Sequence, residues 1–432
     1  MHAFRYIGDK LHCERLAIEP LARKFGTPLF VYSQSTLQDH FQKLDSALSG
    51  VDHLVCFSVK SNSNLSILRL LHDLGSGFDI VSGGELQRVI DAGGDPRKCV
   101  FAGVGKTGSE IEFALKQGVY AFNAESEPEL ERIQRVAARL RKIAPVAVRV
   151  NPNITAHTHA KITTGTYENK FGVAFEQIEA VYARASRLKN LRLVGLQMHI
   201  GSQITAVAPF EAGVRKVLPL ALKLKQQYGI QFLSIGGGLG VIYDPALASG
   251  SAKWWRSSAA RNILTAQSYA ARLVPLLKPS GLRILVEPGR FISGNAGILV
   301  TRIEYVKRTG RKNFLIVDAA MNDLIRPALY DAYHEIVPVV RRKGRPLRAD
   351  VVGPVCESGD FFSKDRSLPQ VGPGDYLALL SAGAYGSVMG SNYNTRPLPA
   401  EVLVHGNKAG LVRERQAIKK IWAGEKIAPW LK

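Results

Sequence analysis

The sequence predicts an α/β protein in which a (β/α)8 TIM-like barrel is followed by a C-terminal antiparallel β-domain. Eight short apolar runs lie between residues 54 and 290, and mostly polar, helix-compatible stretches separate them. Each run ends at polar residues or glycines. Beyond residue 290 the pattern changes to short strands joined by Gly and Pro turns. Alternating strands and helices indicate a parallel sheet, and eight such units close most naturally into a barrel.

The eight predicted barrel strands all end where this fold places its chemistry, at the C-terminal ends of the strands. They are LVCFSVKSN (54–62), GFDIVSGGE (77–85), CVFAGVGK (99–106), VYAFNAES (119–126), PVAVRVNP (145–152), LVGLQMHIGS (193–202), FLSIGGGLG (232–240) and RILVEPGR (283–290).

Three domain segments follow from these patterns. Residues 36–290 form the barrel, and 291–432 form the β-domain, because regularly spaced short strands with Gly and Pro turns indicate an antiparallel sheet. Residues 1–35, with TPLFVYS as a strand, are expected to join the β-domain. The stretch 246–261 looks like an insertion after the seventh barrel strand, placed either over the site mouth or on the outside of the barrel.

The composition indicates a large enzyme with no membrane span. The chain has 432 residues, 46% of them hydrophobic, and no apolar run of roughly 18 residues that could cross a bilayer. The first residues lack the apolar core of a secretory signal, which favours a cytoplasmic location. The four cysteines show no metal-ligand spacing, so reduced thiols and no metal are expected.

The net charge of +21 raises the question of a nucleic-acid partner. The basic residues are spread along the chain and do not interleave with aromatic residues as in an RNA-binding sheet. We therefore interpret them as a solvated surface and expect neither nucleic acid nor membrane as a partner. Part of this positive field could draw in an anionic cofactor or substrate.

Three strand ends together indicate a cofactor. Lys60 ends the first strand, and a lysine there is by itself usually a solvated terminus. The Gly236, Gly237 and Gly238 turn after the seventh strand can direct backbone N–H groups at a phosphate. Glu287 begins the EPGR segment after the eighth strand. A lysine able to form an imine, a phosphate cradle and an acid at one barrel mouth fit pyridoxal phosphate.

Motifs along nearly the whole chain carry a family resemblance. They are FSVKSN, GFDIVSGGE, VRVNP, AHTHAKITTG, NKFG, MHIGSQ, GGGLG, EPGRF, DAAMNDLIRPALY, GPVCESGD and SAGAYGSVMGSNYN. In combination the sequence resembles the fold-type III pyridoxal-phosphate-dependent decarboxylases, which have an alanine racemase-like barrel. It is most similar to the diaminopimelate decarboxylases among them.

The resemblance implies roles for the barrel residues. Lys60 would attach the cofactor covalently and later assist proton transfer, His199 would lie against its ring, and Glu287 would keep the pyridine nitrogen protonated. The phosphate would be held by Ser202, Gly236, Gly237 and Gly238, with backbone contacts from the Pro288, Gly289 and Arg290 segment. Asp79, Glu85 and Arg149 would support the lysine and the ring, although each could equally belong to an ordinary barrel ion pair.

The resemblance places further site residues in the β-domain. Cys356 of the partner subunit would return a proton to the substrate, and thiols are acids suited to that task near neutral pH. Tyr385 would contact cofactor and substrate from the same domain. The active site would then be shared across a homodimer, and the monomer would be inactive. A buried, inert cysteine is the alternative.

The expected substrate, meso-2,6-diaminopimelate, carries an amino-acid group at each end. By motif, Arg290, Arg326, Tyr330 and Glu357 would hold its distal end, with arginine suited to carboxylate and Glu357 to ammonium. The implied reaction yields L-lysine and CO2, the last step of lysine biosynthesis. A decarboxylase for ornithine, arginine or carboxynorspermidine, or a non-catalytic regulatory homologue, stays as an alternative at this point.

Overall fold

The computed structural model describes residues 1–154 and 170–431, and these divide into two compact units. The first contains residues 1–35, 242–252 and 295–432, and the second contains 36–241 and 253–294. Each unit is described by itself below. Within the residues described, no helix is long and apolar enough to cross a membrane.

The second unit is a closed barrel of parallel strands, which confirms the predicted fold class. Each strand pairs with the next around the ring, and the last pairs with the first. In ring order the strands are β5 (His53–Ser58), β6 (Gly77–Ile80), β7 (Cys99–Phe101), β8 (Ala121–Ala124), β9 (Ala144–Asn151), β11 (Leu191–Met198), β12 (Phe232–Ser234) and β13 (Arg283–Val286). The short strand β10 (Val173–Ala174) pairs with β9 beside the ring.

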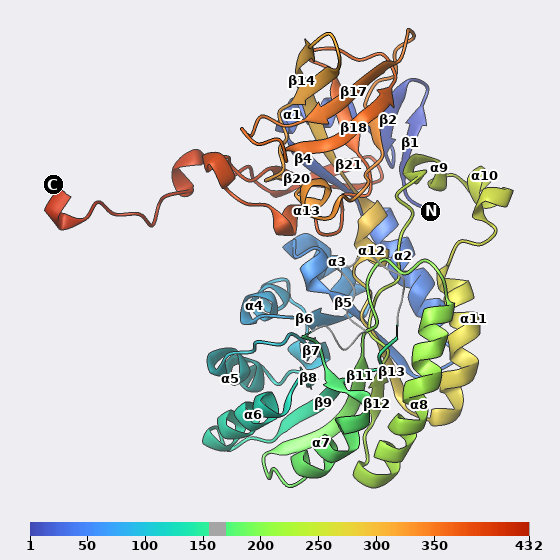
Figure 1. Cartoon of the computed structure of the whole chain (residues 1–432), viewed down its shortest axis with the longest axis vertical. Helices are drawn as coiled ribbons and strands as arrows, with labels where there is room; N and C mark the ends of the chain where they lie inside the picture. The colour runs from blue at the N-terminus through green and yellow to red at the C-terminus, as the bar shows by residue number, and fades with distance from the viewer. Residues whose placement is uncertain (155–169, 432) are drawn as a thin grey trace. The chain divides into compact units, whose positions relative to one another are not determined.

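Helices surround this ring (Figure 1). They are α2 (Gln34–Ala47), α3 (Leu65–Asp73), α4 (Gly83–Asp91), α5 (Gly108–Gln117), α6 (Glu127–Arg139), α7 (Ile178–Ala185), α8 (Ala208–Tyr228), α11 (Ala266–Leu277) and the short α12 (Arg290–Ser293). Their starts are encoded locally: Thr107 and Glu110 form a capping box at α5, and Ser126 caps α6. Gly118 ends α5 in the left-handed conformation, with φ 73°.

Apolar side chains fill the inside of the barrel. They come from different strands and include Cys56 of β5, Val100 of β7, Ala147 of β9 and Phe232 of β12. Such layers of inward side chains make a packed core and not a pore. The polar chemistry is therefore confined to the strand ends.

The first unit is built on a mixed sheet with mainly antiparallel pairs. Its strand order is β18-β17-β15-β14-β4-β20-β21, with β19 pairing β14 and β16. The strands are β4 (Leu29–Ser33), β14 (Gly297–Arg308), β15 (Asn313–Val317), β16 (Ile336–Pro338), β17 (Leu347–Val352), β18 (Phe361–Leu368), β19 (Tyr376–Leu379), β20 (Ala400–His405) and β21 (Lys408–Arg413). Two pairs, β15 with β17 and β4 with β20, are parallel.

The N-terminal strand β4 lies inside this sheet. It pairs with β14 on one side and β20 on the other, and all five of its residues are buried. A further three-stranded sheet, β1 (Phe4–Ile7), β2 (Lys10–Cys13) and β3 (Leu16–Ala17), precedes helix α1 (Ile18–Phe25). Residues 1–35 therefore contribute one fully buried strand, together with a small sheet and a helix whose apolar side chains reach the core of the first unit.

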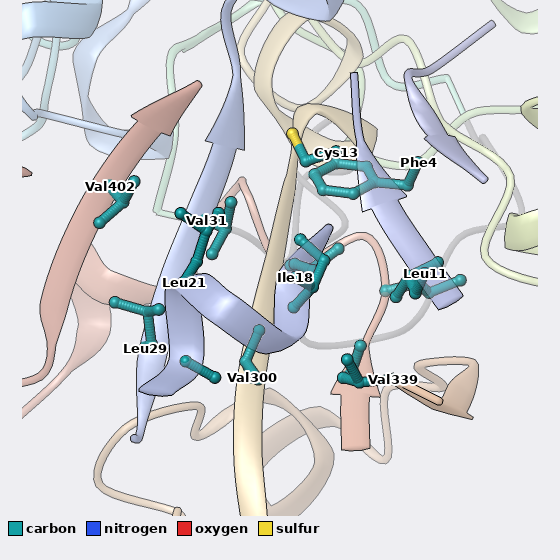
Figure 2. Close-up of a cluster of buried hydrophobic side chains, with 14 of the residues drawn as sticks. Phe4, Leu11, Cys13, Ile18, Leu21, Leu29, Val31, Val300, Val339 and Val402 are labelled. Atoms are coloured by element: carbon teal, nitrogen blue, oxygen red, sulfur yellow. The ribbon is translucent and has the colours of Figure 1, made fainter. Parts of the chain in front are cut away.

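The core of the first unit joins segments that are distant in sequence. Figure 2 shows Ile18 and Leu21 of α1 packed with Val31 of β4, Val300 of β14 and Val402 of β20. Burial of such side chains stabilises the fold by roughly 1.5–3 kcal/mol each before conformational entropy is counted. This cluster ties the N-terminal strands to the C-terminal ones.

The segment after β12 crosses from one unit to the other. Residues 242–252 belong to the first unit, and the chain returns to the barrel at residue 253. Two short helices, α9 (Ala246–Ser249) and α10 (Ala252–Trp255), lie in the stretch that looks like an insertion in the sequence. Part of that stretch is therefore built into the β-domain.

Candidate active site

Three predicted site residues lie on neighbouring barrel strands. Strand β5 is hydrogen-bonded to β13 on one side and to β6 on the other. Lys60 lies in the 3-10 turn Val59–Ser61 directly after β5, Asp79 is in β6, and Glu287 follows β13. Because parallel strands end at the same edge, these three residues from distant parts of the chain come together.

Asp79 holds the Lys60 amine. The distance from Lys60 Nζ to Asp79 Oδ2 is 2.7 Å, and Ser58 Oγ donates to the same oxygen at 2.7 Å. The side chain of Asp79 is 1% exposed, whereas that of Lys60 is 41% exposed. The amine is thus oriented by a buried carboxylate and reachable from solvent, as imine formation with an aldehyde requires.

Glu287 is a buried carboxyl group with a set of neutral donors. Its Oε1 accepts from Ser234 Oγ at 2.6 Å, and its Oε2 accepts from Gln197 Nε2 at 3.0 Å. Burial, and then the nearby charge of Asp79, raise its pKa to about 7. A carboxylate in this setting gains most from a cationic partner, and a protonated pyridine nitrogen is one.

His199 follows β11 and is fixed by the glycine turn. The backbone N–H of Gly237 donates to His199 Nδ1 at 3.2 Å, which places the ring proton on Nε2. Burial lowers the pKa of His199 well below its usual value, and the charges of Arg149 and Lys60 act in the same direction. The imidazole is therefore neutral, and a neutral ring can lie flat against another aromatic ring.

The turn after β12 admits only glycine at three positions, and at Gly236, which has φ 71°, a Cβ would overlap the carbonyl oxygen of Met198. A Cβ on Gly237 would overlap the carbonyl oxygen of Glu287. Gly238 has φ 108°, and a Cβ there would lie 2.5 Å from the carbonyl oxygen of Gly201. The backbone of this turn is consequently bare of side chains.

Arg290 and Ser202 also come together. Arg290 begins α12, is 7% exposed, and donates from Nη2 to Ser202 Oγ at 3.2 Å. Both residues are predicted to lie on the phosphate side of the site. Ser202 follows β11, the glycine turn follows β12 and Arg290 follows β13, so all three stand at the ends of neighbouring strands. An arginine, a hydroxyl and exposed backbone are the donor types that bind phosphate.

Arg149 belongs to a buried ion pair. Its Nη1 lies 2.8 Å from Glu125 Oε1, and the guanidinium carbon lies 4.8 Å from the centre of the Phe171 ring. Within the described part of the chain, its buried Nη2 has no hydrogen-bond partner. A buried donor without a protein partner is costly, so this nitrogen is suited to a bound ligand.

A second buried pair lies close to the first in the chain. Lys106 Nζ donates to Glu129 Oε1 at 2.7 Å and to the carbonyl oxygen of Asn123 at 2.8 Å. Glu129 Oε2 in turn accepts from the backbone N–H of Glu125 at 2.8 Å. Burial lowers the pKa of Lys106, and the charge of Glu129 opposes this shift.

Glu85, a predicted supporting residue, has a perturbed carboxyl. It lies in the first turn of α4 and accepts from the backbone N–H of Val81 at 2.7 Å. Burial raises its pKa to about 7, while the charge of Lys60 opposes this shift. Its titration is therefore linked to the charge state of the lysine.

Sequence reasoning missed the partners that orient the main residues. Ser58 precedes Lys60 by two positions, Gln197 precedes His199 by two, and Ser234 precedes the glycine turn by two. Side chains on a strand alternate between its faces, so a polar residue two positions upstream of a site residue points the same way. That spacing is the signal that could have found them.

The predicted β-domain residues lie on two loops and one short helix. Arg326 and Tyr330 begin and end α13 (Arg326–Tyr330), and Arg326 Nη1 lies 2.9 Å from His334 Nε2. Cys356 is exposed and lies on the loop between β17 and β18.

Glu357, next to Cys356, accepts a hydrogen bond from the hydroxyl of Tyr393. Tyr385 lies in the loop after β19 with φ 55°. A positive φ is uncommon at a non-glycine residue, and nine other non-glycine residues in the described part of the chain share it. The motif AHTHAKITTG (156–165) lies outside the described residues.

These features fit pyridoxal phosphate. The barrel supplies a reachable amine, a buried acid with a raised pKa, a bare glycine turn and an unpartnered buried guanidinium nitrogen. In the ranges 1–154 and 170–431, no group of His, Cys, Asp and Glu side chains is arranged to hold a metal ion.

Comparisons with known proteins agree with this fit. Residues 34–294 match the family described as "Pyridoxal-dependent decarboxylase, pyridoxal binding domain". The diaminopimelate decarboxylase of Pseudomonas aeruginosa is 49% identical over 433 residues, covering 99% of this chain and 100% of that one. That of Vibrio cholerae is 47% identical over 431 residues, with the same coverage.

A solved structure has the same fold over the whole chain. Diaminopimelate decarboxylase from M. jannaschii in co-complex with L-lysine is 34% identical, has a TM-score of 0.91, and covers 100% of both chains.

Proposed function

This chain belongs to the diaminopimelate decarboxylases of the pyridoxal-dependent decarboxylase family, and from this premise we propose which of its residues carry the reaction. The reaction converts meso-2,6-diaminopimelate to L-lysine and CO2, the last step of lysine biosynthesis. The observation that carries the assignment is the group formed by Lys60, Asp79 and Glu287 on three neighbouring strands. The identity over the full chain sets aside decarboxylases of other amino acids and a non-catalytic homologue.

The barrel residues would bind the cofactor and control its protons. Lys60 would attach it, Asp79 would orient the lysine amine, and Glu287 would hold the proton on the pyridine nitrogen. When bound, pyridoxal phosphate supplies an electron sink for the carbanion that CO2 leaves behind. His199 would lie against the ring because its imidazole is neutral and fixed by Gly237.

The phosphate would be held on the other side of the barrel mouth. Ser202 and the backbone of Gly236, Gly237 and Gly238 would bind it, together with the segment Pro288 to Arg290. The support for this proposal is the bare backbone of the turn and the hydrogen bond between Arg290 and Ser202. The unpartnered nitrogen of Arg149 would donate to the cofactor as well.

The β-domain residues would grip the distal end of the substrate. Arg326 would pair with its carboxylate, Glu357 with its ammonium, and Tyr330 and Tyr385 would contact it. Leaving one member of a buried charge pair unmatched costs roughly 2–5 kcal/mol, or about 30-fold to a few thousandfold in affinity. That difference would exclude ornithine, which lacks the distal carboxylate.

The substrate test compares amino acids in parallel. Purified protein supplied with pyridoxal phosphate should release CO2 from meso-diaminopimelate and form lysine, and should release little from L-ornithine, L-lysine or L-arginine. Lys60→Ala is the matched control, because it should lose both the turnover and the absorbance of the attached cofactor. Substantial release from ornithine would overturn the substrate assignment, and retained absorbance in Lys60→Ala would overturn the lysine assignment.

We further propose a homodimer in which Cys356 and Tyr385 of one subunit complete the site of the other. The exposure of Cys356 supports this, because a proton donor must reach the substrate. The enzyme would be cytoplasmic, where four free thiols stay reduced. Mixing inactive Lys60→Ala with inactive Cys356→Ala should restore roughly a quarter of wild-type activity, since half of the random dimers carry one intact site. No recovery after verified subunit exchange would refute the shared site.

A further inference from the structure

Arg326 is fixed by two neutral aromatic residues that the sequence did not indicate. Its side chain is 6% exposed and its Nη1 lies 2.9 Å from His334 Nε2. Its guanidinium carbon lies 5.0 Å from the centre of the Tyr243 ring. The contact with Tyr243 has cation–π geometry, and all three residues belong to the first unit.

The hydrogen bonds of His334 determine its protonation. Its Nδ1 lies 2.8 Å from the carbonyl oxygen of Leu380, so Nδ1 carries a proton and donates it. Its Nε2 faces an arginine, which can only donate, so Nε2 must accept with its lone pair. His334 is therefore a neutral imidazole that orients the Arg326 guanidinium without neutralising its charge.

The sheet holds His334 in this position. Leu380 donates its backbone N–H to the carbonyl oxygen of Glu335 at 2.8 Å, next to His334. The following residues form β16, which pairs with β19 through Ile336 and Leu379. His334 is 0% exposed, and its hydrogen bond to the carbonyl oxygen of Leu380 ties the imidazole to the residue that follows β19.

Tyr243 is held by the segment that crosses from the barrel into the first unit. The carbonyl oxygen of Ile242 accepts from Asn295 Nδ2 at 3.0 Å, and the backbone N–H of Leu247 donates to Glu335 Oε2 at 2.7 Å. The Tyr243 ring meets the His334 ring edge-on, with centroids 5.4 Å apart and planes at 85°. Through Tyr243, the segment 242–252 therefore contacts both Arg326 and His334.

We infer that Tyr243 and His334 are positioning residues, which present the Arg326 guanidinium to the distal carboxylate of the substrate. This inference rests on the proposed function of Arg326. His334 and Tyr243 fix the plane of the guanidinium, and because neither carries a negative charge, neither neutralises its positive charge. A carboxylate partner in place of His334 would compete with the substrate for that charge. The inference also gives residues 242–252 a role in specificity.

The test compares two ligands that differ only by a carboxylate. L-Lysine and cadaverine would be titrated as competitive inhibitors of meso-diaminopimelate turnover by the holoenzyme. His334→Phe keeps a ring but removes the acceptor, and Tyr243→Leu removes the aromatic face. Each should weaken L-lysine binding by on the order of 10-fold and change cadaverine binding less than about twofold. KM for diaminopimelate should rise with little change in kcat.

Two further variants make the outcome decisive. His334→Gln, whose amide oxygen can accept from Arg326, should recover part of the L-lysine affinity. Tyr6→Leu disrupts another ring and arginine contact of the same unit, Tyr6 with Arg341 at 3.6 Å, and should leave both inhibitors unaffected. If His334→Phe weakened both ligands equally or neither, the positioning role would be overturned.

Arg326→Met separates this inference from the proposal on which it rests. It should remove the preference for L-lysine over cadaverine. If it did not, the proposed function of Arg326 would be wrong. If it did, and His334→Phe and Tyr243→Leu kept the preference, only the positioning role would fail.

Discussion

Replacing Glu287 by Gln should change how the stability of the cofactor-free protein depends on pH. Burial and the charge of Asp79 raise the pKa of Glu287 from 4.5 to about 7. Between these values the folded protein holds a proton that the unfolded chain has released, so stability falls as pH rises. The contribution of Glu287 is complete below about pH 4.5 and is lost above about pH 7, a change of about 3 kcal/mol.

The E287Q protein is expected to fold. The amide oxygen of the new side chain can accept from Gln197 Nε2, and its NH2 group can donate to Ser234 Oγ, at the positions of the present hydrogen bonds. An amide does not titrate, so the stability of the variant should depend less on pH. The difference between wild type and variant should therefore grow by up to about 3 kcal/mol from pH 5 to pH 8.

Urea unfolding of both cofactor-free proteins between about pH 5 and pH 8 measures this difference. Asp323→Asn in the first unit is the matched control, because burial raises the pKa of Asp323 only to about 6. From pH 6 to pH 8 the control should follow the wild type while E287Q departs from it. Parallel curves for wild type and E287Q over the whole range would refute the argument that folding raises the pKa of Glu287.

Three other substitutions test the site. Cys356→Ala should lower kcat roughly 100-fold or more while the absorbance of the attached cofactor stays, and unchanged turnover would remove the proton-donor assignment. Gly237→Ala should lose cofactor affinity in an equilibrium titration, because its Cβ would overlap the carbonyl oxygen of Glu287; normal affinity would contradict the role of the turn. Lys106→Ala should cost about 3–5 kcal/mol in urea unfolding by leaving Glu129 buried without its cation, and a loss below about 1 kcal/mol would show that the pair is not stabilising.

The barrel could be predicted because its strands are continuous apolar runs that end at polar residues. Strand β18 was missed, since FFSKDRSL carries five charged or hydroxyl residues between its apolar ends and so lacks the pattern of an apolar strand. The short strands β1 to β3 lie among charged residues in the first part of the chain and were missed for the same reason. Parallel pairing of β4 with β20 cannot be read from either strand alone, because it depends on which distant segments meet.

The same distinction separates the site residues that could be predicted from the sequence from those that could not. Lys60, Glu287 and the glycine turn stand at strand ends, so the fold predicts that they meet. His334 and Tyr243 lie in loops without periodicity, and each acquires its role only from a tertiary contact with Arg326. The ion pair between Lys106 and Glu129 could not be predicted from the sequence either, because each residue looks like an ordinary polar position of a helix or loop.

Strand β4 has a consequence for the order in which the protein is made. It leaves the ribosome before any barrel strand, yet both of its partners, β14 and β20, follow the last barrel strand. All five residues of β4 are buried in the folded protein. During synthesis they have no strand partner until the whole barrel has been made. The first unit therefore begins to be synthesised before the barrel and is completed after it. A chain released before residue 400 would lack β20, and the unpaired edge of β4 could then bind other unfinished chains.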